Sequence, residues 1–486
     1  MGQVTMLWPF MPLGVGETLL SYVARLSLFH TGMGPRRLLD DLGMSAERFA
    51  AGHADEVARL AEATGNDLGL LECAAVRIAP RHIEFRGERL SKDFLVTRAA
   101  RYCPNCLATR DRADWEHSLA WGFRHVHRCP DHGVRLAATG NHLAIDLRQV
   151  VDANDVHPEE PVADEQPEYL DWLEERLRGE ARGDDWLSGQ TIEQVLAASE
   201  MIGAVLQHGH KVSLKKLPAT KKEVATDIGF TIYREGPEAV TEALTTIRNT
   251  SSASAVQAGP LAMYGTLYDW LDRRCNAIDP GPIRDLLREH IVEHDAVGAG
   301  ETVLGVEITH RRYHSVESLA EATGISRSRL GRLLQKMGRV PAGATEAECG
   351  RMRFDADEIT GFIADSETAI PLSGVPEYIG ASKRQVEMLY AAEIVLPLVP
   401  RTGRGAVRNV VFARRHLDEL LSTISELPEA GPTDGSLSSI SYACQRGIGT
   451  TPDVVRRILS GELPAFRKPG PPRLDRVLVS AIRASA

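Results

Sequence analysis

Two cysteine-containing motifs hold the residues of this chain that are best suited to chemistry. Cys103 and Cys106 form a C-P-N-C motif, and Cys129 and His132 form a C-P-D-H motif after twenty-two intervening residues. Zinc binds four sulfur or nitrogen ligands as a tetrahedron, and a two-residue spacer lets both members of a pair point into one turn. A catalytic zinc ion would keep one position for water, whereas these four residues fill the shell. The sequence therefore predicts one closed, structural Zn2+ site.

Histidines between the two motifs offer alternative ligands. They are His117, His125 and His127. Only His132 has the two-residue spacing to a cysteine, so we expect His132 to bind the metal. His125 and His127 alternate around Val126, which we interpret as a strand with solvated or supporting histidine side chains. Two unrelated cysteine clusters in a reduced protein are the remaining alternative.

The composition predicts a multidomain protein of a reducing compartment. At 486 residues, 43% hydrophobic and 25% charged, the chain has room for about three or four domains. It contains no apolar run of about 18 residues and no basic-then-apolar leader, so we expect neither a membrane span nor a secretory signal. Its seven cysteines are an odd number, which favours the cytoplasm. We expect four scattered thiols to be small core residues rather than catalytic groups, namely Cys73, Cys275, Cys349 and Cys444.

The charge is uneven along the chain. The formal net charge is -10 at pH 7, yet residues 381–415 and 441–486 each carry +5, whereas residues 152–185 carry -10. A basic C-terminal region suits nucleic acid, and the acidic segment suits a protein partner better than DNA.

The N-terminal two thirds of the chain is predicted to be mainly helical. A helix over residues 14–30 has an apolar stripe and a polar row, Glu17, Ser21 and Arg25, at four-residue steps. The sequence leaves open whether that row is a solvated face or a functional one. Other predicted elements are two or three helices over 35–64, short strands over 77–100, an acidic linker over 152–167, helices over 169–177 and 191–206, a basic loop over 211–222, and helices over 236–249, 261–274 and 282–294.

Residues 301–345 have a helix-turn-helix pattern. Gly324 supplies the turn and Ser326 caps the second helix. A basic open face on that helix suits phosphates and groove edges, and the alternative is a helical hairpin whose basic face is incidental. The predicted inner residues are Leu319, Ala320, Ile325, Leu330, Leu333 and Leu334, and the predicted DNA contacts are Arg327, Arg329, Arg332 and Lys336.

Two further units toward the C-terminus repeat this plan. In residues 365–425, Gly380 makes the turn, Ser382 caps the second helix, and two apolar arms over 398–412 predict the β-hairpin of a winged helix. The predicted core is Val375, Ile379, Val386 and Leu389, and the predicted DNA contacts are Lys383, Arg384, Arg401, Arg404 and Arg408. Residues 435–486 form a weaker basic helical unit with a helix capped by Thr450 or Thr451, inner residues Val454, Val455, Ile458 and Leu459, and DNA contacts Arg456 and Arg457. The predicted fold is mainly α and multidomain, with a zinc-ribbon or knuckle module followed by tandem helix-turn-helix and winged-helix units.

Several segments, over roughly residues 10–340, together resemble the TniQ family, which includes the TnsD target selectors of bacterial transposons. They are G-E-T-L-L-S-Y-V-A-R-L at 16–26, R-Y-C-P-N-C-L at 101–107, W-x-x-x-x-x-H-R-C-P-D-H-G-V-R-L at 121–136, D-I-G-F at 227–230 with E-G-P-E-A-V at 235–240, and L-Y-D-W-L at 267–271. The resemblance implies a TniQ N-terminal domain over 1–150 with its zinc knuckle at 101–136, and an acidic linker with a helical region over 151–300. Many family members carry another cysteine pair just after the second motif, but residues 137–147 contain none, so one metal site is implied.

The resemblance also implies a function. TniQ proteins are non-catalytic, DNA-binding accessory proteins of transposition that select the target site and couple it to a AAA+ regulator and the transposase. In CRISPR-associated transposons they dock on an RNA-guided effector complex. The implied partners are therefore double-stranded DNA, the AAA+ regulator, the transposase and, in such systems, the effector complex, while a homodimer is left open.

Other functions stay open on the sequence alone. One is a helix-turn-helix transcriptional regulator with a zinc-stabilised sensor domain, and another is an adaptor that docks on a guide-RNA complex and hardly touches DNA. A metallohydrolase is disfavoured because four thiolate-rich ligands would fill the zinc shell. The chain has no G-x-x-x-x-G-K-[ST] motif and no evident nucleophile–base grouping, which favours a binding protein over an enzyme.

Overall fold

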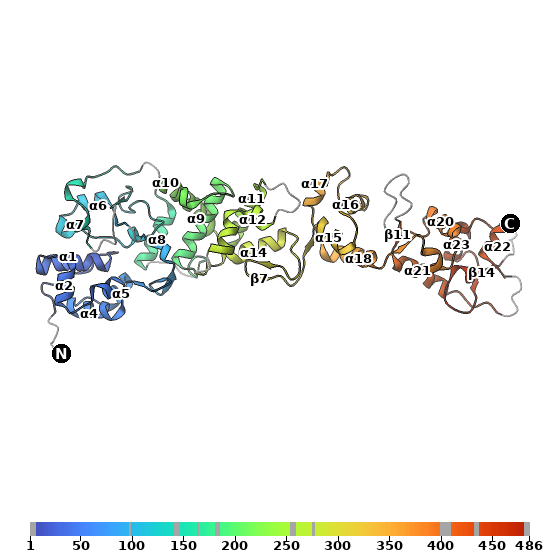
Figure 1. Ribbon diagram of the computed structural model, residues 1–486, viewed down its shortest axis with the longest axis horizontal. Coiled ribbons are helices and arrows are strands. Elements are labelled where there is room, and N and C mark those ends of the chain that lie inside the picture. The colour runs from blue at the N-terminus through green and yellow to red at the C-terminus, as the bar shows by residue number, and fades with distance from the viewer. Residues whose placement is uncertain are drawn as a thin grey trace. The chain divides into compact units, whose positions relative to one another are not determined.

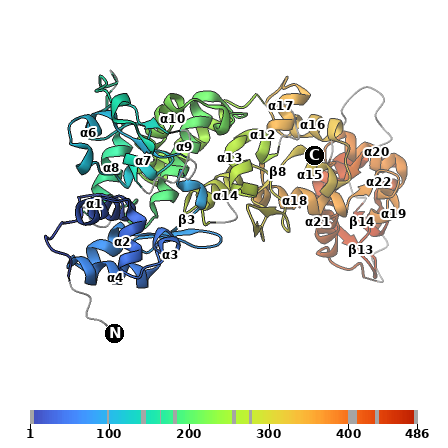
Figure 2. The same ribbon diagram turned by 60° about the vertical axis from the view of Figure 1, so that its left-hand side comes forward.

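The computed structural model divides the chain into two compact units (Figures 1 and 2). Unit 1 comprises Met1–Glu293 and Thr302–Val306, and unit 2 comprises His294–Glu301 and Glu307–Ala486. The finer predicted domain boundaries stay predictions. The structure describes residues 6–96, 99–139, 146–162, 165–179, 185–252, 259–274, 278–398, 410–431 and 437–480.

Unit 1 begins with five helices and a small antiparallel sheet. In α1 (Leu19–Thr31), the Thr18 side chain caps the first turn by accepting a hydrogen bond from the Ser21 amide, and Gly32 ends the helix at φ +68°. The predicted short strands form a three-stranded meander. The remaining elements are α2 (Pro35–Asp41), α3 (Ala46–Ala50), α4 (Ala54–Thr64), α5 (Leu68–Ala74), β1 (Val76–Ile78), β2 (Ile83–Phe85), β3 (Glu88–Leu90) and the 3-10 helix η1 (Lys92–Phe94).

The second half of unit 1 is mainly helical. The predicted basic loop over 211–222 is too long, because a helix starts at Ala219, directly after Pro218. The predicted helix over 261–274 is broken at Gly265, which has φ +56°, and it continues as a π-helical turn. The elements are α8 (Glu168–Arg178), α9 (Ile192–His208), η5 (Leu214–Lys216), α10 (Ala219–Arg234), α11 (Pro237–Asn249), α12 (Pro260–Tyr264), α13 (Thr266–Asp269), η6 (Trp270–Arg274) and α14 (Ile283–His294).

Helices α9 and α10 are in direct backbone contact through two glycines. A Cβ atom on Gly203 would lie 1.8 Å from the Ala225 carbonyl oxygen, and one on Gly229 would lie 1.8 Å from the Ser199 carbonyl oxygen. No side chain can occupy either position at this separation of the helices. Gly229 is the glycine of the D-I-G-F segment, so the helix contact explains that residue.

We expect Gly229→Ala to force α9 and α10 apart and to lower the free energy of unfolding by about 1–3 kcal/mol or more, since a methyl group must be inserted into a packed contact. Chemical denaturation followed by circular dichroism measures the loss. Gly361 is the matched control, because it is an exposed helical glycine, and a Cβ atom placed on it would meet no other atom within 4 Å. Gly361→Ala should stabilise its helix by about 0.5–1 kcal/mol, and equal effects of the two substitutions would contradict the close contact.

Unit 2 begins with a small helical core that contains the first predicted helix-turn-helix. Helix α15 (Val316–Thr323) ends at Gly324 with φ +66°, and α16 (Arg327–Lys336) follows after Ser326. Ser326 occupies the cap position but makes no side-chain cap hydrogen bond. All the predicted inner residues belong to one core with Phe354, Ile359 and Phe362. The other elements are β8 (Tyr313–His314), which pairs with β9 (Phe354–Asp355), α17 (Glu346–Arg351) and α18 (Ala356–Glu367). The ribbon of β6 (Thr302–Val303) and β7 (Val306–Glu307) precedes them in the chain and belongs to unit 1 up to Val306.

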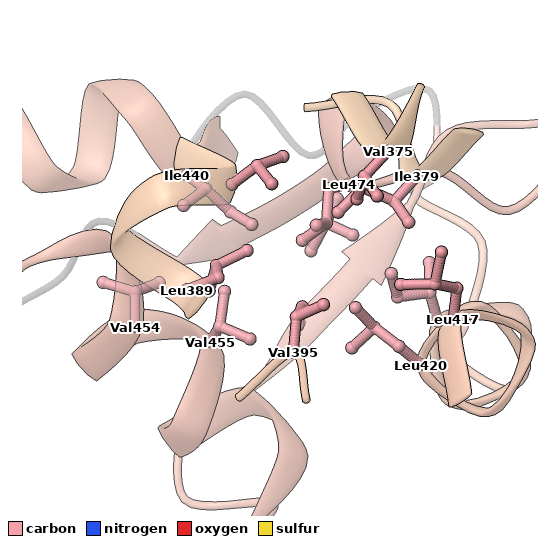
Figure 3. Close-up of a cluster of buried hydrophobic side chains, with 14 of the residues drawn as sticks. Val375, Ile379, Leu389, Val395, Leu417, Leu420, Ile440, Val454, Val455 and Leu474 are labelled. Carbon is pink, nitrogen blue, oxygen red and sulfur yellow. The ribbon is translucent and has the colours of Figure 1, made fainter. Parts of the chain in front are cut away.

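The rest of unit 2 is built around a single hydrophobic core (Figure 3). Leu389 of α20, Val455 of α23 and Leu474 lie in one cluster, so the two predicted C-terminal units share their interior. The elements are β10 (Ile370–Pro371), α19 (Val375–Ile379), α20 (Lys383–Ala391), β11 (Val411–Phe412), α21 (Arg414–Ser425), β12 (Leu437–Ser439), α22 (Ile440–Gln445), α23 (Thr451–Leu459), β13 (Ala465–Arg467), η8 (Leu474–Arg476) and β14 (Val477–Ser480).

The predicted helix-turn-helix residues of this core are in place, whereas the predicted wing stays a prediction. Gly380 is left-handed at φ +69°, and Ser382 caps α20 by accepting a hydrogen bond from the Gln385 amide. Strand β11 pairs with β10, and the Leu398 amide donates to the Val411 carbonyl at 2.8 Å. The predicted tip, with Arg401, Arg404 and Arg408, lies outside the described residues.

Helix α23 differs from the sequence prediction in one core residue, and its cap is one of the two threonines predicted. Thr450, rather than Thr451, caps α23 and forms a capping box with Asp453. Val454 and Val455 are buried, but Leu459 is 40% exposed and is not a core residue, because it lies in the last turn of α23 beyond the cluster. Within the described residues, no helix is both long and apolar enough to cross a membrane.

Candidate metal centre

The backbone brings the two cysteine motifs together by pairing the strand before the first with the strand after the second. Strand β4 (Arg101–Tyr102) leads into the first motif, and β5 (Ala137–Ala138) follows the second; they are antiparallel, with Arg101 opposite Ala138. Helix α6 (Pro104–Ala108) begins inside the first motif, where the Cys103 sulfur accepts a hydrogen bond from the Cys106 amide.

The second motif is a tight turn closed by its own backbone. The Cys129 amide donates to the Val134 carbonyl at 2.8 Å, and the Gly133 amide donates back to the Cys129 carbonyl at 2.8 Å. Gly133 adopts φ +65°, a conformation that L side chains rarely adopt, so the glycine after His132 allows the turn.

The four predicted ligands converge at distances that suit zinc. Their ligand atoms all lie within 4.8 Å of one another. The Cys106 sulfur lies 3.7 Å from the Cys129 sulfur, and the His132 Nδ1 atom lies 3.2 Å from Cys106 and 3.7 Å from each of Cys103 and Cys129. A tetrahedron with Zn–S of about 2.3 Å and Zn–N of about 2.0–2.1 Å requires S···S near about 3.8 Å and S···N near about 3.5 Å. The donor set and its spacing therefore fit one tetrahedral ion.

Crowding of the thiols gives a physical reason for a cation at this position. Hydrogen bonds with Cys106 and Cys129 lower the pKa of Cys103 to about 3, whereas hydrogen bonds with Cys103 and Cys129 raise the pKa of Cys106. The three sulfurs therefore cannot all be thiolates without a nearby positive charge. Cys103 and Cys129 are fully buried, and Trp115 and Val134 pack around them in a small separate core.

The histidines between the motifs are not part of the cluster, as expected, but the predicted strand over 125–127 is wrong. His125 lies in a turn and is only 2% exposed, with its Nε2 atom 3.2 Å from Glu200 on α9. Burial, together with the charge of nearby Arg101, lowers the pKa of His117 to about 4 and that of His127 to about 3. Both are therefore neutral at pH 7.

The predicted polar row is buried and joins α1 to the metal centre, although the helix begins at Leu19 rather than residue 14 and Glu17 precedes it in a β-bridge with Ser118. Glu17, Ser21 and Arg25 are each less than one tenth exposed, and Arg25 donates to both carboxylate oxygens of Glu17 at 2.9 and 2.6 Å. The Ser21 hydroxyl donates to Glu17 and accepts from the His117 amide at 2.9 Å. Arg25 also lies 3.5 Å from Glu116, which pairs with Arg110, just after α6. These three residues are therefore an internal contact rather than a solvated face, and we call Glu17, Ser21 and Arg25 the α1 clamp.

Arginines next to the second motif anchor the metal centre to α10. Arg128, which is 2% exposed, donates to both carboxylate oxygens of Glu223 at 2.9 and 2.7 Å, and Arg135 forms an ion pair with the same carboxylate. Glu223 is 1% exposed. Sequence reasoning missed this trio, although an arginine directly beside a metal-binding cysteine is the local signal for it.

Two carboxylates of α9 complete the attachment. Glu200 faces His125 and pairs with Arg124 at 3.2 Å; burial alone would raise the pKa of Glu200, but these neighbours outweigh it and hold the pKa at about 2. Glu193 accepts hydrogen bonds from the amide and the hydroxyl of Ser91. Buried ion pairs and hydrogen bonds to carboxylates therefore join the part of unit 1 that contains the metal centre to its helical region.

The segment predicted as an acidic linker is instead attached to the metal module. The Asn105 side chain donates to the Glu159 carbonyl at 2.9 Å and accepts from the Glu159 amide at 2.7 Å. The Val162 amide donates to the Gly133 carbonyl at 3.1 Å. Its described acidic side chains, those of Asp152, Asp155, Glu159, Glu160 and Glu165, are exposed. The other short elements between α6 and α8 are η2 (Arg112–Asp114), η3 (Ala120–Gly122), α7 (Leu147–Val150) and η4 (Ala153–Asp155).

The arginines and lysines predicted to contact DNA differ in whether their side chains already have a partner within the protein. Arg327 lies 3.3 Å from Glu317, and the Arg332 side chain donates to the Ser328 carbonyl of its own helix. Arg456 donates to the Ala392 carbonyl at the end of α20, so it has an internal role. Within the described residues, Lys383 and Arg384 are exposed without an ion-pair partner, and Arg457 is half-buried; the Lys336 side chain lies outside the described part of the structure.

Of the other cysteines, Cys349 is buried and Cys444 half-buried, in line with the prediction, but Cys73 is exposed. Cys275 lies outside the described residues.

Comparison with known families locates the relationship in this module. Residues 9–136, from the segment before α1 to the end of the second motif, match the family model TniQ. The chain carries a TniQ domain. The resemblance to the TniQ family is thereby confirmed for the part that contains the α1 clamp and all four metal-binding candidates. No curated protein matches the chain.

The TniQ assignment supports an association with transposition and DNA, without naming particular partners. Its match ends at residue 136, so Glu223 and the other α9 and α10 contacts of the TniQ domain lie beyond it.

Proposed function

We propose that this chain is a non-catalytic, DNA-binding accessory protein of transposition, which acts in the cytoplasm, selects the target site and couples it to a AAA+ regulator and transposase. The observation that carries the proposal is the TniQ match over residues 9–136, which coincides with the complete Cys3His cluster. A structural Zn2+ held by Cys103, Cys106, Cys129 and His132 would stabilise the TniQ domain and leave no position for substrate.

The α15–α16 pair supports the assignment of DNA binding to unit 2. A left-handed glycine joins two helices that bury their apolar faces in one core, as in helix-turn-helix proteins. Arg327 and Arg332 are exposed on α16, with Arg329 half-buried between them. The ion pair of Arg327 with Glu317 is at the surface, where such pairs contribute little, so a phosphate can replace the carboxylate.

We expect simultaneous replacement of Arg327, Arg329 and Arg332 by alanine to weaken duplex-DNA binding by about 10-fold to 1000-fold. Loss of three phosphate contacts should also make the negative slope of log K against log salt shallower by about 2–3. Fluorescence anisotropy with a labelled duplex over a salt series measures both quantities.

A matched control removes three exposed cations of unit 2 that already have carboxylate partners. These are Arg339, Arg414 and Arg473, which pair with Glu358, Asp418 and Asp475. The control should change affinity much less. Unchanged binding and salt slope in the α16 variant would remove the role given to that helix, and would leave an adaptor that hardly touches DNA as the better description.

The partner assignment needs its own test. Co-purification with a AAA+ regulator from the same genetic neighbourhood supports coupling to transposition, whereas DNA binding confined to a promoter without such a partner would favour a transcriptional regulator. The exposed acidic segment that Asn105 holds against the TniQ domain is the surface we assign to this protein partner, since its charge repels DNA.

A further inference from the structure

A cluster of lysines without a salt bridge among the described residues lies in unit 1, outside the sequence segments predicted as helix-turn-helix. Residues 209–222 contain five lysines and no acidic residue, although the whole chain has a net charge of -10. Four of the lysines are exposed and Lys222 is half-buried. Within the described residues, no hydrogen bond or salt bridge joins any of their side chains to a partner. We call Lys211, Lys215, Lys216, Lys221 and Lys222 the lysine surface.

The backbone beneath the lysine surface is held firmly. The Thr266 hydroxyl donates to the carbonyls of His210 and Val212 at 2.9 and 3.0 Å, and the Thr266 amide donates to His210 at 2.8 Å. Val212 is buried, and the ring of His210 contacts the Ile247 carbonyl at 2.8 Å. Lys211, between His210 and Val212, therefore extends from a fixed backbone, whereas Lys215 and Lys216 lie on η5 and Lys221 and Lys222 on α10. A fixed backbone reduces the entropy lost when a partner binds.

Fold stability does not account for these lysines. Lys221 and Lys222 lie in the first turn of the sixteen-residue helix α10, which has no acidic residue in that turn. Cations are unfavourable there because the helix dipole is positive at its N-terminus. Five like charges without a salt bridge among the described residues also repel one another, although Lys222 is close enough to Glu200 to lower the pKa of that carboxyl. An external anion offsets both costs.

The shape of the neighbouring surface favours an extended anion over a small one. Lys211 and Lys215 line a cleft of about 560 Å3 whose walls come from both the TniQ domain and the helical region. Four carboxylates also line this cleft, so a small anion would meet negative charge inside it. They are Asp93, Glu193, Glu200 and Asp279. A polyanion lying along the lysines outside the cleft avoids them.

We propose that the lysine surface is a second binding surface for the phosphate backbone of double-stranded DNA, additional to the helix-turn-helix units. Lysine provides a flexible point charge for phosphates without reading bases, so the contact is independent of sequence. The proposal rests on the proposed DNA-binding function, and it places a sequence-independent part of the affinity in unit 1.

The test compares the full-length protein with a variant in which all five lysines are replaced by glutamine. Binding to a short duplex of arbitrary sequence is measured over a salt series. The slope of log K against log salt is negative, and loss of five phosphate contacts should make it shallower by about 4–5. Binding at low salt should weaken by at least about 100-fold. Circular dichroism should show an unchanged fold, since no hydrogen bond or salt bridge of the described residues involves the substituted side chains.

A charge-matched control separates a local surface from a change in net charge. It replaces five exposed, ion-paired arginines of unit 1 by glutamine, which are Arg37, Arg77, Arg178, Arg234 and Arg273. We expect this variant to keep most of its affinity and slope. Equal losses in both variants would overturn the lysine surface.

The remaining outcomes distinguish the inference from the proposed function. If the wild type binds duplex DNA and the α16 arginine variant is weakened but the five-lysine variant is not, only the lysine surface is wrong. If the five-lysine variant loses an RNA or an acidic protein while its duplex affinity is unchanged, the lysine surface is again wrong. If the wild type binds no duplex DNA, the proposed function and the inference both fail.

Discussion

Cys106→Ser is expected to abolish binding of about one zinc ion per chain and to unfold the TniQ domain. Binding of structural zinc contributes about 10–16 kcal/mol to folding in small zinc modules. Loss of one ligand should therefore lower the free energy of unfolding of unit 1 by more than about 4 kcal/mol. At about 2–4 °C per kcal/mol for a domain of this size, its melting temperature should fall by about 8 °C or more. Metal analysis of the purified protein and differential scanning calorimetry measure the two effects.

The structure shows how such unfolding would spread. Cys106 lies in α6, Arg110 follows that helix, and Glu116 links Arg110 to Arg25 of the α1 clamp. We therefore expect loss of partner docking before loss of the proposed DNA contacts of α16, because that helix belongs to unit 2. Cys73→Ser is the matched control, since Cys73 is an exposed cysteine of the same unit outside the cluster. A Cys106→Ser protein that folds normally and loses only DNA binding would contradict the structural role of the metal.

Glu223→Ala is expected to lower the free energy of unfolding of unit 1 by about 3–5 kcal/mol. The substitution leaves Arg128 buried without its carboxylate, and removing one member of a buried ion pair costs much more than the pair itself contributes. Urea denaturation followed by tryptophan fluorescence measures the loss.

A double variant separates the buried charge from lost packing. Adding Arg128→Met to Glu223→Leu removes both buried groups of that pair and should restore part of the stability. Glu168→Gln is the exposed control: its partner Arg234 is 42% exposed, so we expect a change within about 0.5 kcal/mol. Similar losses for Glu223→Ala and Glu168→Gln would show that the trio does not hold the TniQ domain against α10.

The local features of the metal site could be predicted because they depend on spacing within the chain. The C-P-N-C and C-P-D-H motifs determine their turns, and the prediction of His132 over His117 follows from the two-residue spacer. The helix-turn-helix cores of unit 2 were predictable for the same reason, since Gly324, Leu330 and Leu334 lie within one short segment.

The long-range contacts could not be predicted from such patterns. Arg128 and Glu223 are 95 residues apart, and Ser21 and His117 are 96 residues apart. Helical periodicity alone cannot tell whether Glu17 faces water or an arginine. The start of α10 was missed because five lysines around Pro218 indicate a loop, although Pro commonly stands at a helix start.

The central claim, that this TniQ-domain protein selects targets for transposition, is tested most directly by comparing where the protein binds in the genome with where the associated transposon inserts. Cells would carry either the wild type or the α16 arginine variant, and both maps would be made by sequencing. The account predicts that insertions cluster beside sites bound by the wild type and lose this clustering in the variant. Insertions that keep the same distribution without the protein would contradict it.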